Sequence, residues 1–257
     1  MTHVKELATT LAEAHESGRA LVLPTVWDVW SARTAEEAGF EGITTGSHPV
    51  ADATGSSDGE NMDFADYLAV VARITGAVDV PVSADVESGY GLVPAELIER
   101  VLEAGAVGVN IEDVVHSEGK RVRDRNEHAD YIAAARQAAD AAGVDFVING
   151  RTDALKFGPD VFADPLSEAV ERAKLMEQAG ARSVYPVGLS SAEDVTRLVE
   201  AVSVPVNLTV HPVDGHAAGD LAALTALGAR RFTFGPLWQM WLKEVSSDQL
   251  ASWRPGA

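Results

Sequence analysis

The sequence predicts one (β/α)8 barrel, the fold also called a TIM barrel, and two observations support this. The chain has 257 residues, which is the usual size of one such barrel. A small-residue turn also recurs along the chain, and each copy closes a helical pattern just before an apolar run. Glycine after a helix end supplies a left-handed cap, and the apolar runs are typical of buried parallel strands. The copies are Ala38-Gly39, Thr75-Gly76, Ala104-Gly105, Ala142-Gly143, Ala179-Gly180 and Leu227-Gly228, while Val202-Ser203 lacks the glycine.

The predicted elements alternate along the whole chain, which we take as a single domain over residues 1–257. Residues 2–16 form an amphipathic helix in which Leu7 and Leu11 lie one turn apart. Helical patterns such as 94–104 and 167–178 separate the strands, and a last helical segment covers about 236–253. Eight alternations favour a closed parallel barrel over the alternative, an open doubly wound sheet. The strands are expected near 21–24, 42–45, 82–85, 107–111, 146–149, 183–186, 206–209 and 232–234.

Charge and composition narrow the class of partner. The chain has 20 Lys and Arg against 39 Asp and Glu, a formal charge of −19, which repels nucleic acid and anionic membranes. It has no cysteine, which excludes disulfides, thiolate metal sites and a cysteine nucleophile or acid. The N-terminal segment lacks the apolar core of a signal peptide, and no stretch reaches the roughly 18 apolar residues of a membrane span. We therefore expect a cytoplasmic protein with a small-molecule partner.

Four carboxylates are expected together at one end of the barrel. Asp85 and Glu87 follow the third predicted strand, and Glu112 and Asp113 follow the fourth. Active sites of such barrels lie at these C-terminal strand ends. So many carboxylates would repel one another unless a cation lay among them, and oxygen ligands without cysteine favour Mg²⁺ or Mn²⁺ over zinc. Asp85 is the first choice for direct contact, whereas Asp113 equally fits a helix cap or an ion pair with arginine.

Groups that bind anions follow other strands. Arg151 follows the fifth strand, where its planar guanidinium suits a bidentate grip on a substrate carboxylate. The alternative is a structural salt bridge from Arg151 to Glu112. Backbone N–H groups of the turn Thr45-Gly46-Ser47 can hold a second anionic oxygen.

Further polar residues follow the predicted strands at the same C-terminal end of the barrel. His48 and His116 are candidates for proton transfer because imidazole titrates near neutral pH. The remaining residues expected to contact the substrate are Trp27, Tyr185 and Asn207.

With these residues in place, the sequence resembles the isocitrate lyase/phosphoenolpyruvate mutase superfamily from about Leu21 to Trp241. Each matching stretch alone is a weak signal, but their order and spacing together are specific. The stretches are Trp27-Asp-Val-Trp-Ser-Ala32, Thr44-Thr-Gly-Ser47, Asp58-Gly-Glu60, Asp85-Val-Glu-Ser-Gly-Tyr-Gly91, Asn110-Ile-Glu-Asp113, Arg151-Thr-Asp153 and Asn207.

The resemblance implies a Mg²⁺ site on Asp85, Glu87 and Glu112, with Asp58 contacting the ion through water or facing the substrate. It also implies that Gly46, Ser47 and Arg151 bind the carboxylate of a 2-oxo acid. The metal would then act as a Lewis acid on the enolate that forms when a C–C or P–C bond breaks. The implied activity is that of a lyase or mutase.

One loop departs from the resemblance. Isocitrate and methylisocitrate lyases carry Lys-Lys/Arg-Cys-Gly-His after the fourth strand, whereas this chain has Lys120-Arg-Val-Arg-Asp124. The resemblance is therefore to a branch without the cysteine acid. Lys120 and Asn126 are candidate counterparts of the lysine and asparagine of the mutase branch, although their spacing matches poorly.

Several functions and assemblies stay open from the sequence. A decarboxylase or hydrolase of oxaloacetate type, a metal-dependent aldolase and a non-catalytic barrel that binds oxo acids are the alternatives to a lyase or mutase. In the superfamily the last helix is often exchanged between subunits, and Trp238, Met240, Trp241 and Leu242 would suit this. Packing as an ordinary eighth helix is the alternative. We expect a homodimer or homotetramer.

Overall fold

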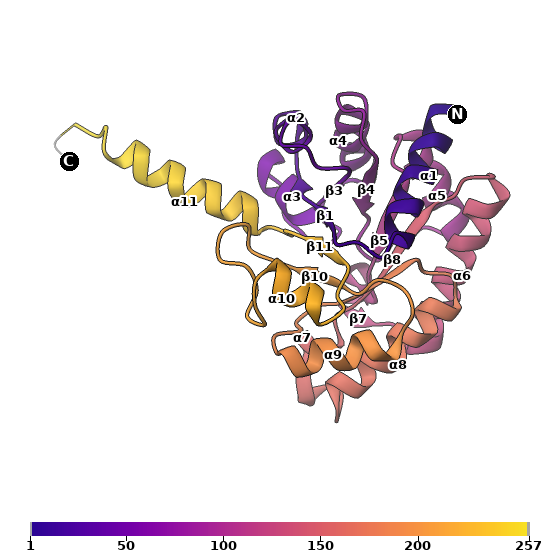
Figure 1. Cartoon of the computed structure of the whole chain (residues 1–257). Coiled ribbons are helices and arrows are strands. Elements are labelled where there is room, and N and C mark those ends of the chain that lie inside the picture. The colour runs from indigo at the N-terminus through magenta and orange to yellow at the C-terminus, as the bar shows by residue number, and fades with distance from the viewer. Residues whose placement is uncertain (1, 256–257) are drawn as a thin grey trace.

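Parallel strands close into a ring in the computed structural model, which describes residues 2–255 (Figure 1). The segments pair in the order β2-β3-β4-β5-β8-β9 and β1-β11-β10. A parallel bridge from Val184 of β9 to Val206, just before β10, joins the two sheets. β1 and β2 are one strand interrupted at Pro24, which has no N–H to donate. Eight strands therefore form a closed barrel, and the open doubly wound sheet is excluded.

Each predicted strand overlaps an observed one, and a short antiparallel hairpin, β6 with β7, was not expected. The strands of the barrel are β1 Leu21–Leu23, β2 Thr25–Val26, β3 Ile43–Thr45, β4 Val82–Asp85, β5 Gly108–Ile111, β8 Val147–Thr152, β9 Ser183–Pro186, β10 Asn207–Thr209 and β11 Arg231–Thr233. The hairpin comprises β6 Val114–Val115 and β7 Arg121–Val122, with the 3-10 turn η1 His116–Glu118 between them.

The helices surround the ring, as Figure 1 shows. Their starts follow local chemistry: Asp28 accepts from the Ser31 N–H in a capping box at α2, and Pro94 opens α5. The helices are α1 Thr2–Glu16, α2 Val29–Glu37, α3 Ser47–Thr54, α4 Phe64–Thr75, α5 Pro94–Glu103, α6 Arg125–Ala141, α7 Ala154–Phe157, α8 Pro165–Gln178, α9 Ala192–Ala201, α10 Leu221–Ala226 and α11 Leu237–Ala251, and η2 Gly158–Asp160 is a second 3-10 turn.

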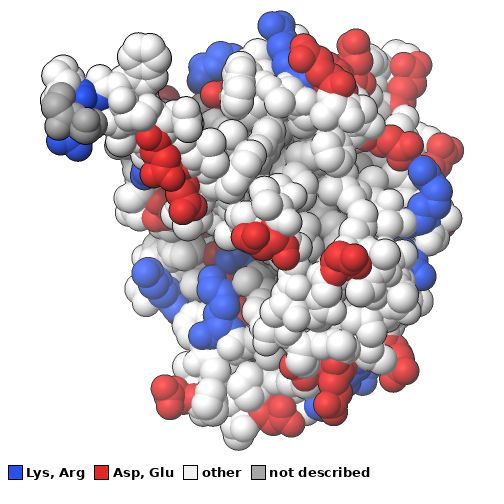
Figure 2. Space-filling view, turned by 60° about the vertical axis from the view of Figure 1, so that its left-hand side comes forward, with Lys and Arg blue, Asp and Glu red and all other residues white. Residues whose placement is uncertain are grey.

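The first and last helices lie in different settings. Leu11 of α1 is buried and reaches Gly108, the first residue of β5, so α1 packs at the N-terminal end of the strands. In contrast, α11 projects away from the barrel (Figures 1 and 2). Its start is partly buried through Trp238, whereas Leu250 is 71% exposed. Within residues 2–255, no helix combines the length and the apolar character needed to cross a membrane.

The barrel interior is polar on one side. Asn110 of β5 donates to the Asp85 carboxylate of β4 (2.9 Å), and Asn149 of β8 donates to Asn110 (3.0 Å). Ser183 of β9 then donates to Asn149 (2.7 Å). Barrel interiors are usually filled by branched apolar side chains. Here the paired residues of four neighbouring strands instead form a row of hydrogen bonds that ends on the Asp85 carboxylate and helps to fix it.

Candidate functional site

A cavity of about 350 Å³ opens at the C-terminal ends of the barrel strands. That end is where the sequence predicts the site. The cavity brings together eight of the predicted residues, which come from four different strand ends and from the loop after α3. They are Thr45, Gly46, Ser47, His48, Asp58, Asp85, Arg151 and Tyr185.

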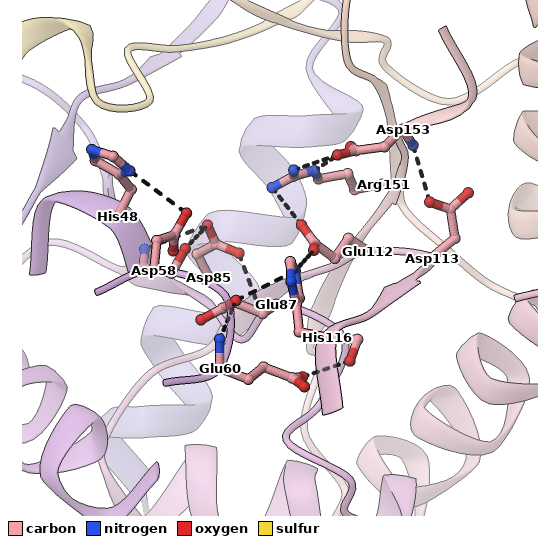
Figure 3. A network of polar contacts seen from close by, with 12 residues as sticks. His48, Asp58, Glu60, Asp85, Glu87, Glu112, Asp113, His116, Arg151 and Asp153 are labelled. Atoms are coloured by element: carbon pink, nitrogen blue, oxygen red, sulfur yellow. Dashed lines mark hydrogen bonds and ion pairs between the residues drawn. The ribbon is translucent and has the colours of Figure 1, made fainter. Parts of the chain in front are cut away.

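Buried acids lie beside this cavity (Figure 3). Glu87 and Glu112 are 4% and 2% exposed. Together with His116 they offer one ligand atom each within 4.8 Å of one another. His116 Nε2 lies 2.6 Å from Glu112 and 3.6 Å from Glu87. The tightest group of metal-ligand atoms is therefore Glu87, Glu112 and His116, and the Asp85 oxygens lie outside it.

The proximity of these acids changes their titration. Burial, reinforced by the charges of Asp58, Asp85 and Glu112, raises the pKa of Glu87 to about 8. Burial likewise raises the pKa of Glu112, against the opposing effect of Arg151. The hydrogen bond to Glu112 raises the pKa of His116. Protons therefore occupy this cluster near neutral pH when no cation is bound.

Asp85 is held by donors from three sides. The backbone N–H and hydroxyl of Ser47, the first residue of α3, donate to one oxygen at 3.4 and 3.1 Å. The other oxygen accepts from Asn110 and from the Glu87 N–H. The N-terminus of α3 thus faces a carboxylate, as helix dipoles favour.

Arg151 is already paired within the protein. Its Nη1 lies 2.7 Å from Glu112, and it donates to both oxygens of Asp153 at 2.8 and 2.9 Å. The salt bridge to Glu112 that the sequence left as an alternative is therefore present (Figure 3). Arg151 also lines the cavity, so it lies next to any ligand bound there.

Glu60 joins two loops at the mouth. Its N–H donates to Glu87 (2.7 Å), while its Oε1 accepts from the Ser88 hydroxyl and the Tyr90 N–H at 2.5 and 2.8 Å. Glu60, Glu87 and Tyr90 all have positive φ (57°, 49° and 53°), which costs energy for residues other than glycine. Strained backbone of this kind gathers at functional sites, and here it places the Glu87 carboxylate.

Three predicted residues lie away from the cavity, so the expectation of contact is corrected for each. Trp27 is 8% exposed and packs edge-on against Trp238, because its indole completes the apolar core. Asn207 is fully buried between Arg231 and Thr233, with which it hydrogen bonds. Lys120 points into solvent because it occupies the tight turn between β6 and β7.

Hydrogen bonds decide one further expectation, the role of Asp113. Asp113 is fully buried and accepts from Thr152 (2.6 Å) and Arg172 (3.0 Å), so it takes the structural role that the sequence left open. Asn126 is exposed near the start of α6. His48 lies 3.6 Å from Asp58 at the rim of the cavity.

Sequence reasoning missed several residues of the site. Asn110 and Asn149 line the cavity from within β5 and β8, and neither was named as a site residue from the sequence. Lys156, which donates to Asp153, and the buried Arg231 line it too. The signal available was the inward-facing polar residue within each strand, since alternate strand residues share a face.

The donor set fits a hard divalent cation. Carboxylate oxygens are the ligands that Mg²⁺ and Mn²⁺ prefer. Glu60 Oε2 is buried without a hydrogen-bond partner, and burial next to other acids raises the pKa of Glu87. Both observations describe negative charge that the side chains present do not fully balance, which is what a cation site requires.

Known proteins resemble this chain over most of its length. Residues 11–250 match the profile of the family described as phosphoenolpyruvate phosphomutase. The 2-methylisocitrate lyase of Escherichia coli (strain K12) is 31% identical over 68% of this chain. That match covers 60% of the E. coli protein, so the chain spans only part of its length.

Solved structures agree with this. A protein of Burkholderia cenocepacia J2315, provisionally described as a phosphonomutase, is 38% identical with a TM-score of 0.87, and the match covers 96% of this chain and 99% of that one. A 2,3-dimethylmalate lyase is 27% identical with a TM-score of 0.82, covering 98% and 90% of the two chains. An oxaloacetate acetylhydrolase, solved with oxalate, is 25% identical with a TM-score of 0.85, covering 97% and 87%.

Proposed function

The chain belongs to the phosphoenolpyruvate mutase family of the isocitrate lyase/phosphoenolpyruvate mutase superfamily, and from this premise we propose a Mg²⁺- or Mn²⁺-dependent lyase or mutase. It would break a C–C or P–C bond of a small 2-oxo acid or its phosphonate analogue. Relatives named as lyases and hydrolases of such acids support the reaction class. The observation that carries the proposal is the buried acid cluster beside Arg151, in a cavity of substrate size.

Asp85, Glu87 and Glu112 would hold the metal. The resemblance assigns these three acids, and the structure adds His116 as a neighbour of the last two. When bound, the ion would supply Lewis-acid stabilisation of an enolate. Without the ion, His116 and Arg151 balance the charge of Glu112. Binding of the ion to Glu112 would therefore weaken one or both of these contacts.

The chain's own donors would bind and orient the substrate. The N-terminus of α3 presents the Ser47 N–H and hydroxyl at the cavity wall, where they already contact the Asp85 carboxylate. A substrate carboxylate is the same kind of acceptor. Arg151 of β8 lines the same cavity and adds a planar donor. Tyr185 and Thr209, whose hydroxyls hydrogen bond with each other, form part of the cavity wall at β9 and β10.

Residues at the rim of the cavity would carry out proton transfer. Asp58 lines the cavity and is partly exposed, and His48 lies beside it at 3.6 Å. Carboxylates and imidazoles are the side chains that most often serve as general acids and bases. We therefore propose Asp58 as the acid or base. His116 and Lys120 remain weaker proposals, because His116 is engaged with Glu112 and Lys120 has no contact with the cavity.

A hydrolase of oxaloacetate type is the second candidate. The similarity to an oxaloacetate acetylhydrolase solved with its product oxalate favours it. The absence of cysteine argues in both cases against the cysteine acid of the isocitrate lyases.

An NMR assay with Mg²⁺ tests the proposal. Oxaloacetate, phosphonopyruvate, methylisocitrate and dimethylmalate would each be incubated with the protein, and the products identified. Conversion of one of them supports the proposal, and the product separates lyase, mutase and hydrolase. Mg²⁺-dependent binding of oxalate without any conversion would instead favour a non-catalytic barrel.

The last helix supports an oligomer. Along α11, Met240, Val245 and Leu250 are 55%, 43% and 71% exposed, and Trp253 beyond it is 86% exposed. A projecting helix with exposed apolar side chains is unfavourable in water unless another surface covers it. We propose that a second copy of this chain covers it, as the superfamily resemblance implies.

A further inference from the structure

Arg231 is buried inside the barrel with donors left over. It is the first residue of β11 and only 1% exposed. Its Nη1 donates to Asn207 Oδ1 (2.5 Å), but Nε and Nη2 have no hydrogen-bond partner within residues 2–255. Burying N–H groups without acceptors is costly, so such a guanidinium calls for an explanation beyond packing.

Within residues 2–255, Arg231 also forms no ion pair with an acid. Its one hydrogen-bond partner, Asn207, is a neutral amide. Burial lowers the pKa of Arg231 to about 10, and the neighbouring Tyr185 and Asp85 oppose this effect. A group with this pKa keeps its proton at neutral pH. The barrel therefore holds an uncompensated cation in a chain whose net charge is −19.

Arg231 belongs to the wall of the candidate site. It lines the cavity together with Thr233, two residues on in the same strand, and Gly235, two residues beyond the end of that strand. Because Gly235 lies at the mouth, Arg231 lies deepest of the three. β11 is the eighth strand of the ring, whereas Asp85 and Glu112 follow the third and fourth. The cavity thus has acids on one side and this cation across from them.

We propose that Arg231 is a specificity-determining residue, whose buried charge selects a substrate that carries a second anionic group beyond its 2-oxo acid moiety. The inference rests on the proposed function, since the 2-oxo acid end must be held on the side of the acids and Arg151. Charges interact strongly in a buried site because water screens them little. The field of Arg231 acts on the distal anion without requiring its shielded N–H groups to touch it.

Two matched ligands isolate this effect. 3,3-Difluorooxaloacetate and trifluoropyruvate share the fluorinated 2-oxo acid, and the first carries a carboxylate where the second carries fluorine. Their affinities for the full chain with saturating Mg²⁺ would be measured by calorimetry. The variants are Arg231→Met, which removes the charge at similar length, and Arg231→Gln, which can also keep a hydrogen bond to Asn207. Arg230→Met is the control, because Arg230 donates to the Thr225 and Ala229 carbonyls outside the cavity.

We expect both Arg231 variants to lose about tenfold or more in affinity for 3,3-difluorooxaloacetate, the usual scale for a buried charge, and to keep trifluoropyruvate affinity within about threefold. Thermal unfolding adds a second readout. Removing a buried uncompensated charge should keep or raise the Tm of Arg231→Met.

Equal losses for both ligands, or no loss for either, would overturn the inference while leaving the proposed function standing. So would a loss of equal size in Arg230→Met. If the unaltered protein bound neither ligand in the presence of Mg²⁺, the proposed function and this inference would both fall.

Discussion

Arg151 and Glu112 form a buried ion pair, with Nη1 2.7 Å from Oε2, at the point where the fourth and fifth strands meet the cavity. The other oxygen of Glu112 lies 2.6 Å from His116. Both oxygens of a predicted metal ligand are therefore engaged by side chains. A cation and Arg151 would share this carboxylate, which couples metal binding to the orientation of the guanidinium that faces the substrate.

Arg151→Lys should weaken oxalate binding in the presence of Mg²⁺. Lysine keeps the charge but loses the planar fork that contacts Glu112 and Asp153 together. The expected loss is about 10- to 100-fold, the range for hydrogen bonds to charged groups. Calorimetry measures it, with Arg125→Lys, a partly exposed arginine paired with Glu168, as the control. Unchanged affinity would show that Arg151 serves only the internal ion pairs.

Mg²⁺ should stabilise the protein more at higher pH. Burial and neighbouring acids raise the pKa of Glu87 to about 8, against 4.5 in its ordinary state. Because the folded state holds this proton more tightly than the unfolded state, the folded protein loses stability as pH rises from about 4.5 towards 8. A bound cation stabilises the ionised carboxylate and so removes this loss. The gain in Tm from Mg²⁺ should therefore grow between about pH 6 and pH 9. A gain that stays constant over this range would contradict the assignment of Glu87.

Metal binding should also release protons below the pKa of Glu87. Calorimetric titration with Mg²⁺ in two buffers of different ionisation enthalpy counts these protons. The release should decline as pH rises past about 8, because Glu87 is then already ionised.

Glu60→Ala should weaken Mg²⁺ binding more than Glu60→Gln. Glutamine keeps an oxygen that can accept from Ser88 and Tyr90, whereas alanine removes it and frees the loop that holds Glu87. We expect about a tenfold loss for alanine, as for a buried hydrogen-bonding group. Equal affinities in both variants would show that Glu60 does not position Glu87.

The protein should be a dimer or tetramer at micromolar concentration. Val245→Lys combined with Leu250→Lys places charges on the exposed side of α11 and should reduce the mass to that of a monomer in light scattering. Trp30→Lys is the control, because Trp30 is 59% exposed on a different helix. A monomeric unaltered protein would contradict the proposed role of α11.

The sequence predicted the fold well because the barrel repeats one local signal. In turns such as Ala104-Gly105 and Ala179-Gly180, the alanine caps the end of the helix and the glycine has positive φ. An apolar run follows each turn. Repetition of that unit fixes strand number and order. The acids after β4 and β5 were predicted for the same reason, since parallel strands align their C-terminal ends.

The contacts that the sequence did not predict join side chains from distant segments of the barrel. Nothing local in Glu60 indicates that its carboxylate reaches the Tyr90 N–H, or that Asp113 faces Arg172 and not the mouth. The inward direction of Arg231 likewise follows from the register of β11 with β10 and β1. Such contacts join residues far apart in the chain, and a one-residue change of register would reverse them.

Calorimetric titration of oxalate into the unaltered protein and into Asp85→Ala, each with and without Mg²⁺, tests the metal site most directly. Asp85 lines the cavity and is fixed by Ser47 and Asn110. The account predicts that oxalate binds the unaltered protein only with Mg²⁺, and that Asp85→Ala abolishes this binding while its circular dichroism spectrum stays unchanged. Mg²⁺-dependent binding of equal affinity in a folded Asp85→Ala would contradict it.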